Sequence, residues 1–175
     1  ADELYKTDAL HPDRKTMSNM TVELTKGLTD SWYGGVISGE GAVFKTGTGM
    51  LALSGANTYT GGTTVEKGSV VLTGSLASPV KVDSSGTFIG NGTVAGNLTS
   101  KGTVAAGLNK EAQNLLRSAD TIGTLTINGD FVSTGTIETG VQGKNNSKIN
   151  VSGTSNIAGT KLDVMVGGKP FVNNT

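Results

Sequence analysis

Short apolar clusters, separated by a few small polar residues, run through most of this chain from Gly34 onward. AVFK (42–45), MLAL (50–53), SVVL (69–72) and GTLTI (123–127) are typical, and Gly, Ser, Thr and Asn fill the intervals. Strands of this length are too short for an ordinary sandwich, whose strands average about five or six residues. The spacing favours a parallel β-helix, in which each coil contributes two or three short strands that stack on those of the next coil.

One coil of this kind cannot bury its apolar residues alone, so neighbouring coils must stack to form a continuous core. We expect roughly 20–25 residues per coil and about six coils. Outward Thr and Asn side chains are expected to form hydrogen-bonded ladders between coils. The alternative, a disordered linker, is disfavoured by the recurring Val, Leu and Ile. The residues expected to point inward are Val43, Leu53, Val65, Val71, Val82, Phe88, Val94, Leu98, Val104, Leu125, Phe131 and Ile137.

Composition supports an all-β fold and excludes several functional classes. The 27 Gly residues disfavour helices and suit tight turns. Basic and acidic residues balance at 14 each, which argues against a nucleic-acid partner. There is no Cys, so no disulfide framework holds the fold. The chain also lacks an uninterrupted apolar run of the roughly 18 residues typical of a membrane helix. We expect it to be a segment of a longer precursor, with any targeting signal outside it.

Two segments depart from this pattern. Residues 1–33 carry most of the early charge and are predicted to be an N-terminal join or cap, followed by the β-helix over 34–175. Trp32 and Tyr33 are candidates for closing the open end of the core, although exposed aromatic residues also bind glycans or proteins. NKEAQNLLRSAD (109–120) has apolar residues at helical spacing, and Asn109 is a suitable N-cap. It predicts a side helix or mobile insertion, with a partner-binding loop as the alternative.

The sequence predicts no catalytic or metal site. SGTSNIAG (152–159) resembles the Gly-Thr-Ser around a subtilisin-type nucleophile, but no Pro follows Ser155. The single His11 lies in LHPD, so a Ser-His-Asp triad cannot be assembled within this chain. His11 with Asp8 and Asp13 could gather an ion, yet a solvated terminal segment is the better interpretation. We therefore expect no cofactor and no enzymatic activity.

The stretch GVISGEGAVFKTGTGMLALSGANTYTGGTTVEKGSVVLTGS (35–75) resembles the passenger-associated transport repeat of Gram-negative autotransporters. The family pattern combines a Lys-x-Gly-x-Gly segment with an Asn-x-Tyr-x-Gly-x-Thr-x-Val segment and a closing Gly. The resemblance extends over roughly residues 35–166. The residues of this chain that carry the core of the motif, and are expected to be structural, are Gly55, Asn57, Tyr59, Gly61, Gly62, Thr63, Val65 and Gly68.

This resemblance implies a right-handed parallel β-helix, displayed on the cell surface or secreted by a Gram-negative bacterium. It implies a C-terminal outer-membrane β-barrel as partner, outside this chain. The leading functional hypothesis is a non-catalytic stalk that supports folding, secretion and display. One alternative is an adhesin that binds host protein or glycan, or self-associates. The other is an accessory part of a secreted subtilisin-like serine protease whose catalytic residues lie elsewhere, residues 1–33 being the join.

Overall fold

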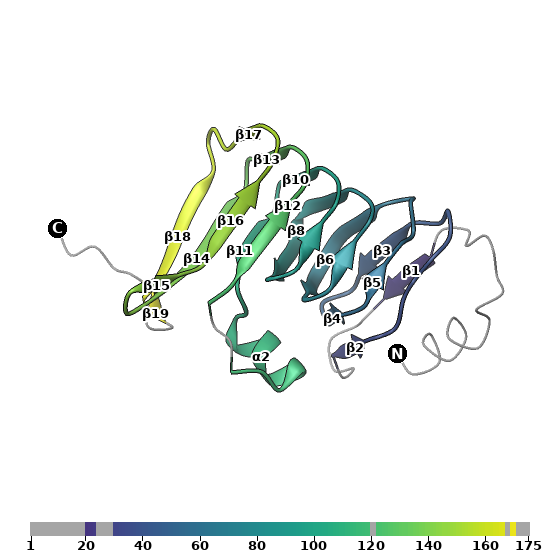
Figure 1. Cartoon of the computed structure of the whole chain (residues 1–175), viewed down its shortest axis with the longest axis horizontal. Coiled ribbons are helices and arrows are strands. Elements are labelled where there is room, and N and C mark those ends of the chain that lie inside the picture. The colour runs from purple at the N-terminus through teal and green to yellow at the C-terminus, as the bar shows by residue number, and fades with distance from the viewer. Residues whose placement is uncertain (1–19, 24–29, 120–121, 167–168, 171–175) are drawn as a thin grey trace.

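The structure, a computed structural model, describes residues 20–23, 30–119, 122–166 and 169–170, and shows a stack of about six parallel β-coils (Figure 1). This confirms the predicted all-β solenoid. Each coil crosses three faces, and strands on each face pair in parallel with those of the preceding and following coils. Parallel pairing satisfies the backbone groups of every inner strand on both edges, which short strands require.

The first face collects the strand that opens each coil. Its strands are β1 (Met20–Glu23), β3 (Val43–Thr46), the first part of β6 (Thr63–Leu72), the first part of β8 (Val80–Gly90), β10 (Leu98–Ser100), β13 (Phe131–Ser133) and β17 (Ser155–Asn156). The second face follows after a corner that β6 and β8 cross without interruption. Its other strands are β2 (Ser31–Tyr33), β4 (Met50–Leu53), β11 (Thr103–Ala106), β14 (Thr136–Gln142) and β18 (Lys161–Val166).

The third face is a separate five-stranded sheet of short strands. Its members are β5 (Ala56–Asn57), β7 (Ser75–Leu76), β9 (Thr93–Val94), β12 (Thr124–Ile127) and β16 (Lys148–Val151). Two further strands pair antiparallel at the C-terminal end, where β15 (Asn145–Asn146) returns on β14 and β19 (Lys169–Pro170) returns on β18. Both β1 and β2 fall within the predicted N-terminal join, and each stacks on a strand of the next coil. The boundary after Tyr33 stays a prediction.

The length of each coil follows from the strand register on the first face. Val43 pairs with Thr63, Thr63 with Val80, and Val80 with Leu98. These central coils are therefore at or below the lower limit of the coil length that we expected. Leu98 then pairs with Phe131, a much larger step along the sequence, because this coil contains the helical excursion.

The interior holds one continuous apolar column. All but one of the residues expected to point inward belong to it, from Val43 to Ile137. The exception is Val71, which is fully buried but lies in a second cluster on the outer side of the second face. Val71 occurs in a run of three apolar residues, Val70 to Leu72, and alternation along the strand places Val70 and Leu72 inside. The prediction that the Val71 side chain points inward is therefore wrong.

The predicted excursion forms a short helix, α2 (Lys110–Leu116), that packs on the outside of the second face. In Figure 1 it leaves the stack after β11 and lies beside the earlier coils, near β2. The side chain of Asn109 accepts a hydrogen bond from the Ala112 amide at 2.8 Å, as the sequence suggested for the N-cap. No helix within the described ranges has the length and hydrophobicity of a membrane span.

Candidate functional site

Among the described residues, we consider two places where several polar side chains are partly or fully buried. The first is the pair of corners in the coil that carries the predicted motif, β3 to β6. The second is a cleft beside the start of α2, on the outer side of the second face. The first lies inside the stack and the second opens to solvent.

Lys45 is the most unusual residue of the first place, because its side chain is fully enclosed. It occupies an inward position of the first face, in register with Val65 of the next coil. Its ammonium Nζ donates hydrogen bonds to the carbonyl oxygens of Thr46 at 2.6 Å, Gly47 at 3.0 Å and Lys67 at 3.1 Å. Burial lowers the pKa of Lys45 to about 8, and the Asp30 carboxylate nearby opposes that shift.

Gly68 provides the space for this ammonium group. A Cβ at Gly68 would lie 2.7 Å from Lys45 Nζ and would overlap the carbonyl oxygens of Gly47 and Gly49. The φ of Gly68 is +72°, in the left-handed region that disfavours side chains. At the corner between the first and second faces, the absence of a side chain at Gly68 thus leaves room for the Lys45 ammonium group.

Asn57 is a second buried polar residue, and it lies in β5 on the third face. It is buried, and its amide oxygen accepts a hydrogen bond from the Ile37 amide of the preceding coil at 3.0 Å. Its Nδ2 donates to the carbonyl oxygens of Gly55 at 3.0 Å and of Ser75, in the following coil, at 3.3 Å. One side chain thus connects three successive coils.

Tyr59 follows Asn57 on the way to the next strand and is also buried. Its hydroxyl forms a hydrogen bond with the Thr63 hydroxyl, and burial raises the pKa of Tyr59 to about 12. Thr63 begins β6, and Val65 of the same strand lies in the apolar interior. Buried Tyr and Thr hydroxyls need partners, and here each supplies the other.

The motif glycines line the close contacts between coils. A Cβ on Gly55 would overlap the carbonyl oxygen of Gly35 in the preceding coil, and one on Gly61 would crowd the Gly41 carbonyl group. Gly62, the next residue, accepts a hydrogen bond from the Val43 amide at 2.9 Å through its carbonyl oxygen. The eight motif residues thus lie in two successive coils, from the end of the coil that β3 opens into β6, which opens the next. That they are structural in role stays a prediction.

The two aromatic residues proposed as an end cap lie in β2 and differ in environment. Tyr33 packs against the apolar interior, whereas Trp32 points outward and is 56% exposed. The Trp32 indole donates a hydrogen bond to the Ser54 hydroxyl at 2.7 Å. The geometry therefore brings only Tyr33 to the core, and their capping role stays a prediction.

Of the residues considered for catalysis and metal binding, the structure describes only Ser155. Ser155 lies in the exposed strand β17, paired with Phe131. His11, Asp8 and Asp13 lie outside the described residues. Within the described ranges, no three His, Cys, Asp or Glu residues cluster in a way that could hold a metal ion.

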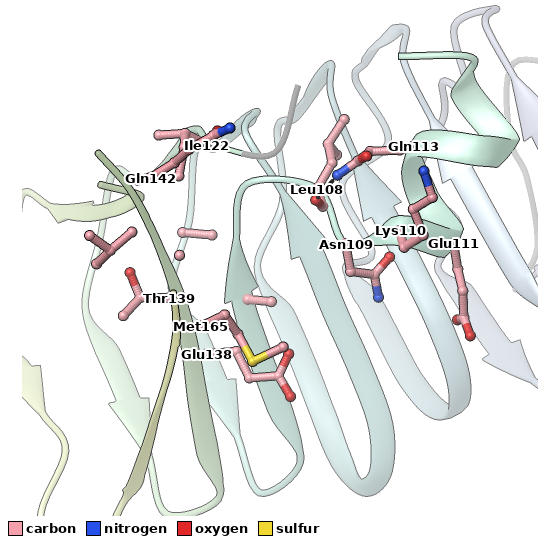
Figure 2. Close-up of a pocket in the computed structure, with 14 residues that line it drawn as sticks. Leu108, Asn109, Lys110, Glu111, Gln113, Ile122, Glu138, Thr139, Gln142 and Met165 are labelled. Carbon is pink, nitrogen blue, oxygen red and sulfur yellow. Dashed lines mark hydrogen bonds between the residues drawn. The ribbon is translucent and has the colours of Figure 1, made fainter. Parts of the chain in front are cut away.

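The cleft beside α2 has a volume of about 630 Å³ (Figure 2). Its walls come from the start of α2, the end of β11 and the outer sides of β14 and β18. Glu138 and Met165 lie close together on one side, with Asn109 and Glu111 toward the helix. Partial burial, with a contribution from Asp163, raises the pKa of the Glu138 carboxyl group. Sequence reasoning missed this cleft, because it forms only when the excursion is placed against later coils.

A comparison with known protein families matches residues 43–72 to the passenger-associated-transport-repeat. This match supports the interpretation that the chain is part of an autotransporter passenger domain. The matched residues run from β3 to the end of β6 and include the enclosed Lys45 and the coil-bridging Asn57. A search of curated proteins finds no matching relative. The repeat and the solenoid together fit a passenger scaffold, and the family implies a secreted or surface-displayed protein of Gram-negative bacteria.

Proposed function

We propose that this part of the passenger is a non-catalytic β-helical stalk that supports folding, secretion across the outer membrane and surface display. The observation that carries the proposal is the arrangement of Asn57, whose three hydrogen bonds reach the preceding coil, its own coil and the following coil. A coil of this kind presents unsatisfied polar groups until the next coil has formed. Such groups are costly when buried, which favours addition of coils in order.

The spacing of contacts supports the same proposal. In the central coils, each strand of the first face pairs with the strand one coil further along the chain, so that partners are close in sequence. Closing such short loops has a modest entropic cost, and nearest-neighbour stacking lets coils fold onto an existing end. A chain that emerges gradually on the far side of a membrane could therefore fold coil by coil. The family implies linkage to its own C-terminal outer-membrane β-barrel, and this chain would be displayed by that barrel.

The test compares two asparagine substitutions in the full precursor, expressed in a Gram-negative host. Asn57→Ala removes the side chain that bridges three coils, while Asn150→Ala changes an exposed residue of β16 and serves as the control. Surface passenger is measured by protease accessibility on intact cells, and retained passenger by periplasmic extraction. We expect Asn57→Ala to lower the surface fraction or to make the displayed chain protease-sensitive, and Asn150→Ala to change neither.

Deletion of residues 34–107 provides the stronger version of this test and also addresses the adhesin hypothesis. Loss of display on deletion supports the stalk. Normal display with loss of attachment to cells or matrix would contradict the stalk and favour a binding surface. The cleft beside α2 is the observation that keeps the adhesin alternative under consideration.

A further inference from the structure

We propose that the cleft beside α2 binds an organic cation with an aliphatic stem, such as a lysine side chain or an alkyl diamine, with Glu138 as its counter-ion. This inference does not rest on the stalk proposal, because a stalk needs no ligand. It rests on the shape of the cleft, the apolar character of its floor and the position of one carboxylate.

The cleft has the size and lining of a small-ligand site. Its volume of about 630 Å³ falls within the range of roughly 300–1,000 Å³ that ligand pockets occupy. Ala105, Ala106 and Leu108 from the β11 side and Met165 from β18 give it an apolar floor. Methylene groups of a ligand would remove this apolar surface from water, and the thioether of Met165 adapts readily to such groups.

The charge of the cleft favours a cation. Glu138 and Glu111 line it, opposed by Lys110 at the start of α2. Lys161, which attracts Glu138 from the adjoining strand, forms an ion pair with Asp163 at 3.0 Å. Among the described residues, no hydrogen-bond or ion-pair partner engages the Glu138 carboxylate. A half-buried carboxylate in this position gains most from a cation that brings its own apolar stem.

The outer column of the second face explains why the cleft occurs here. Ala52, Val71, Ile89 and Ala105 stack in register and form the apolar strip against which α2 packs. The next residue in the same column is Glu138. The strip changes from apolar to acidic where the helical cover ends, so Glu138 faces the open cleft (Figure 2).

The test is a titration of 1,5-diaminopentane into the whole chain, in which backbone amide chemical shifts are measured by NMR. We expect saturable shifts confined to β14, β18 and the start of α2, and none with the uncharged analogue 1,5-pentanediol. Glu138→Gln keeps the shape and should weaken binding at least about tenfold, because a charge-assisted hydrogen bond is lost. Glu66→Gln, at an exposed position of β6, is the matched control and should bind as the parent does.

Two sources of this cation are distinguished by adding Nα-acetyl-lysine methylamide as a second probe. Tighter binding of this probe assigns the cleft to lysine in a polypeptide, and tighter binding of the diamine assigns it to a free amine. The proposal is overturned if neither probe binds, if shifts spread over carboxylates across the surface, or if Glu138→Gln binds as tightly as the parent. Thermal melting of each variant verifies that it is folded, and passenger display tests the stalk separately.

Discussion

At the scale of single residues, the side chains of Lys45 and Asn57 are held inside an apolar stack by hydrogen bonds to backbone groups. Lys45 satisfies three such oxygens, and Asn57 satisfies two more and one amide. Lysine is almost never fully buried without partners, because removing its charge from water is costly. The carbonyl oxygens that converge on Lys45 at the corner, which Gly68 leaves accessible, offset part of this cost.

The enclosed Lys45 gives a pH dependence of stability that can be isolated with Lys45→Met. The pKa is about 8 in the folded chain against a reference of 10.5. Between these values the unfolded chain binds more protons at this position, so the free energy of unfolding rises with pH. We expect the parent to gain stability relative to Lys45→Met between pH 8 and pH 10, as measured by urea unfolding.

The effect of Tyr59 cancels in this comparison. Its raised pKa, about 12, makes the folded chain lose stability with increasing pH above about pH 10, but it does so in both proteins. Lys101→Met, at an exposed position, controls for the loss of a lysine as such. If the free energy of unfolding changes with pH in the same way in the parent and in Lys45→Met, Lys45 is not buried as described.

A comparison of Gly68 with Gly143 separates two causes of destabilisation by alanine, which are close packing and backbone conformation. Gly68 and Gly143 both have positive φ, +72° and +61°, but only Gly68 is crowded by neighbouring atoms. Alanine at Gly143 should destabilise by about 1–2 kcal/mol through conformation alone. Alanine at Gly68 adds overlap with two carbonyl oxygens, so we expect about 2–5 kcal/mol. Equal losses in urea unfolding would show that the contact at Gly68 relaxes freely.

At the scale of elements, α2 is a helix that exists because of the surface beneath it. A helix of seven residues is well below the roughly 12–15 residues at which isolated helices become marginally stable. Ala112 is fully buried against the outer strip, with Leu115 and Leu116 partly buried beside it. The helix should therefore unfold locally when this contact is lost, while the coils beneath remain paired.

Ala112→Asp tests this dependence, because it places a charge in the packed interface. We expect amide hydrogen exchange to accelerate over residues 110–116 and to stay slow in β6 and β8. Asn114→Asp adds the same charge on the exposed side of the same helix and should leave exchange nearly unchanged. Equal acceleration in both variants would mean that the helix does not depend on packing.

Sequence predicted the repeating short strands, the inward column and the helical excursion, because each leaves a local signal. Alternation and spacing identify strands, and the capping Asn109 precedes a segment with helical spacing. The direction of Val71 could not be read, since a run of consecutive apolar residues has no alternation. Both sides of this strand are buried because α2, which comes much later in the chain, covers the outer side. The burial of Lys45 and the cleft around Glu138 depend likewise on contacts between coils.

At the scale of the whole stack, the side chains of β18 are less buried, among the described residues, than those of the coils before it. Ile137 is buried, but Leu162, its register partner in the next coil, is 62% exposed. The ion pairs Lys81–Asp83 and Lys161–Asp163 are exposed and contribute little. Stability therefore comes mainly from the interior, and it is concentrated in the coils that have neighbours on both sides.

Two leucine truncations measure this gradient. Leu76 is fully buried in β7, whereas Leu162 is mostly exposed in β18. Leu76→Ala should destabilise by about 2–5 kcal/mol, since it leaves a cavity in the interior. Leu162→Ala should cost no more than about 0.5 kcal/mol, as surface substitutions do. A comparable loss for both in urea unfolding would contradict the gradient.

The long coil between Leu98 and Phe131 has a consequence for how such a molecule can diversify. The chain leaves after β11, forms α2 and returns as β12, which still pairs with β9 in register. The excursion at this corner thus leaves the parallel pairing of the third face in place. An insertion point of this type can accept sequences of new length and chemistry while the solenoid on either side is preserved. Variation at this corner would alter the outer surface of the second face while the stacked coils stay the same.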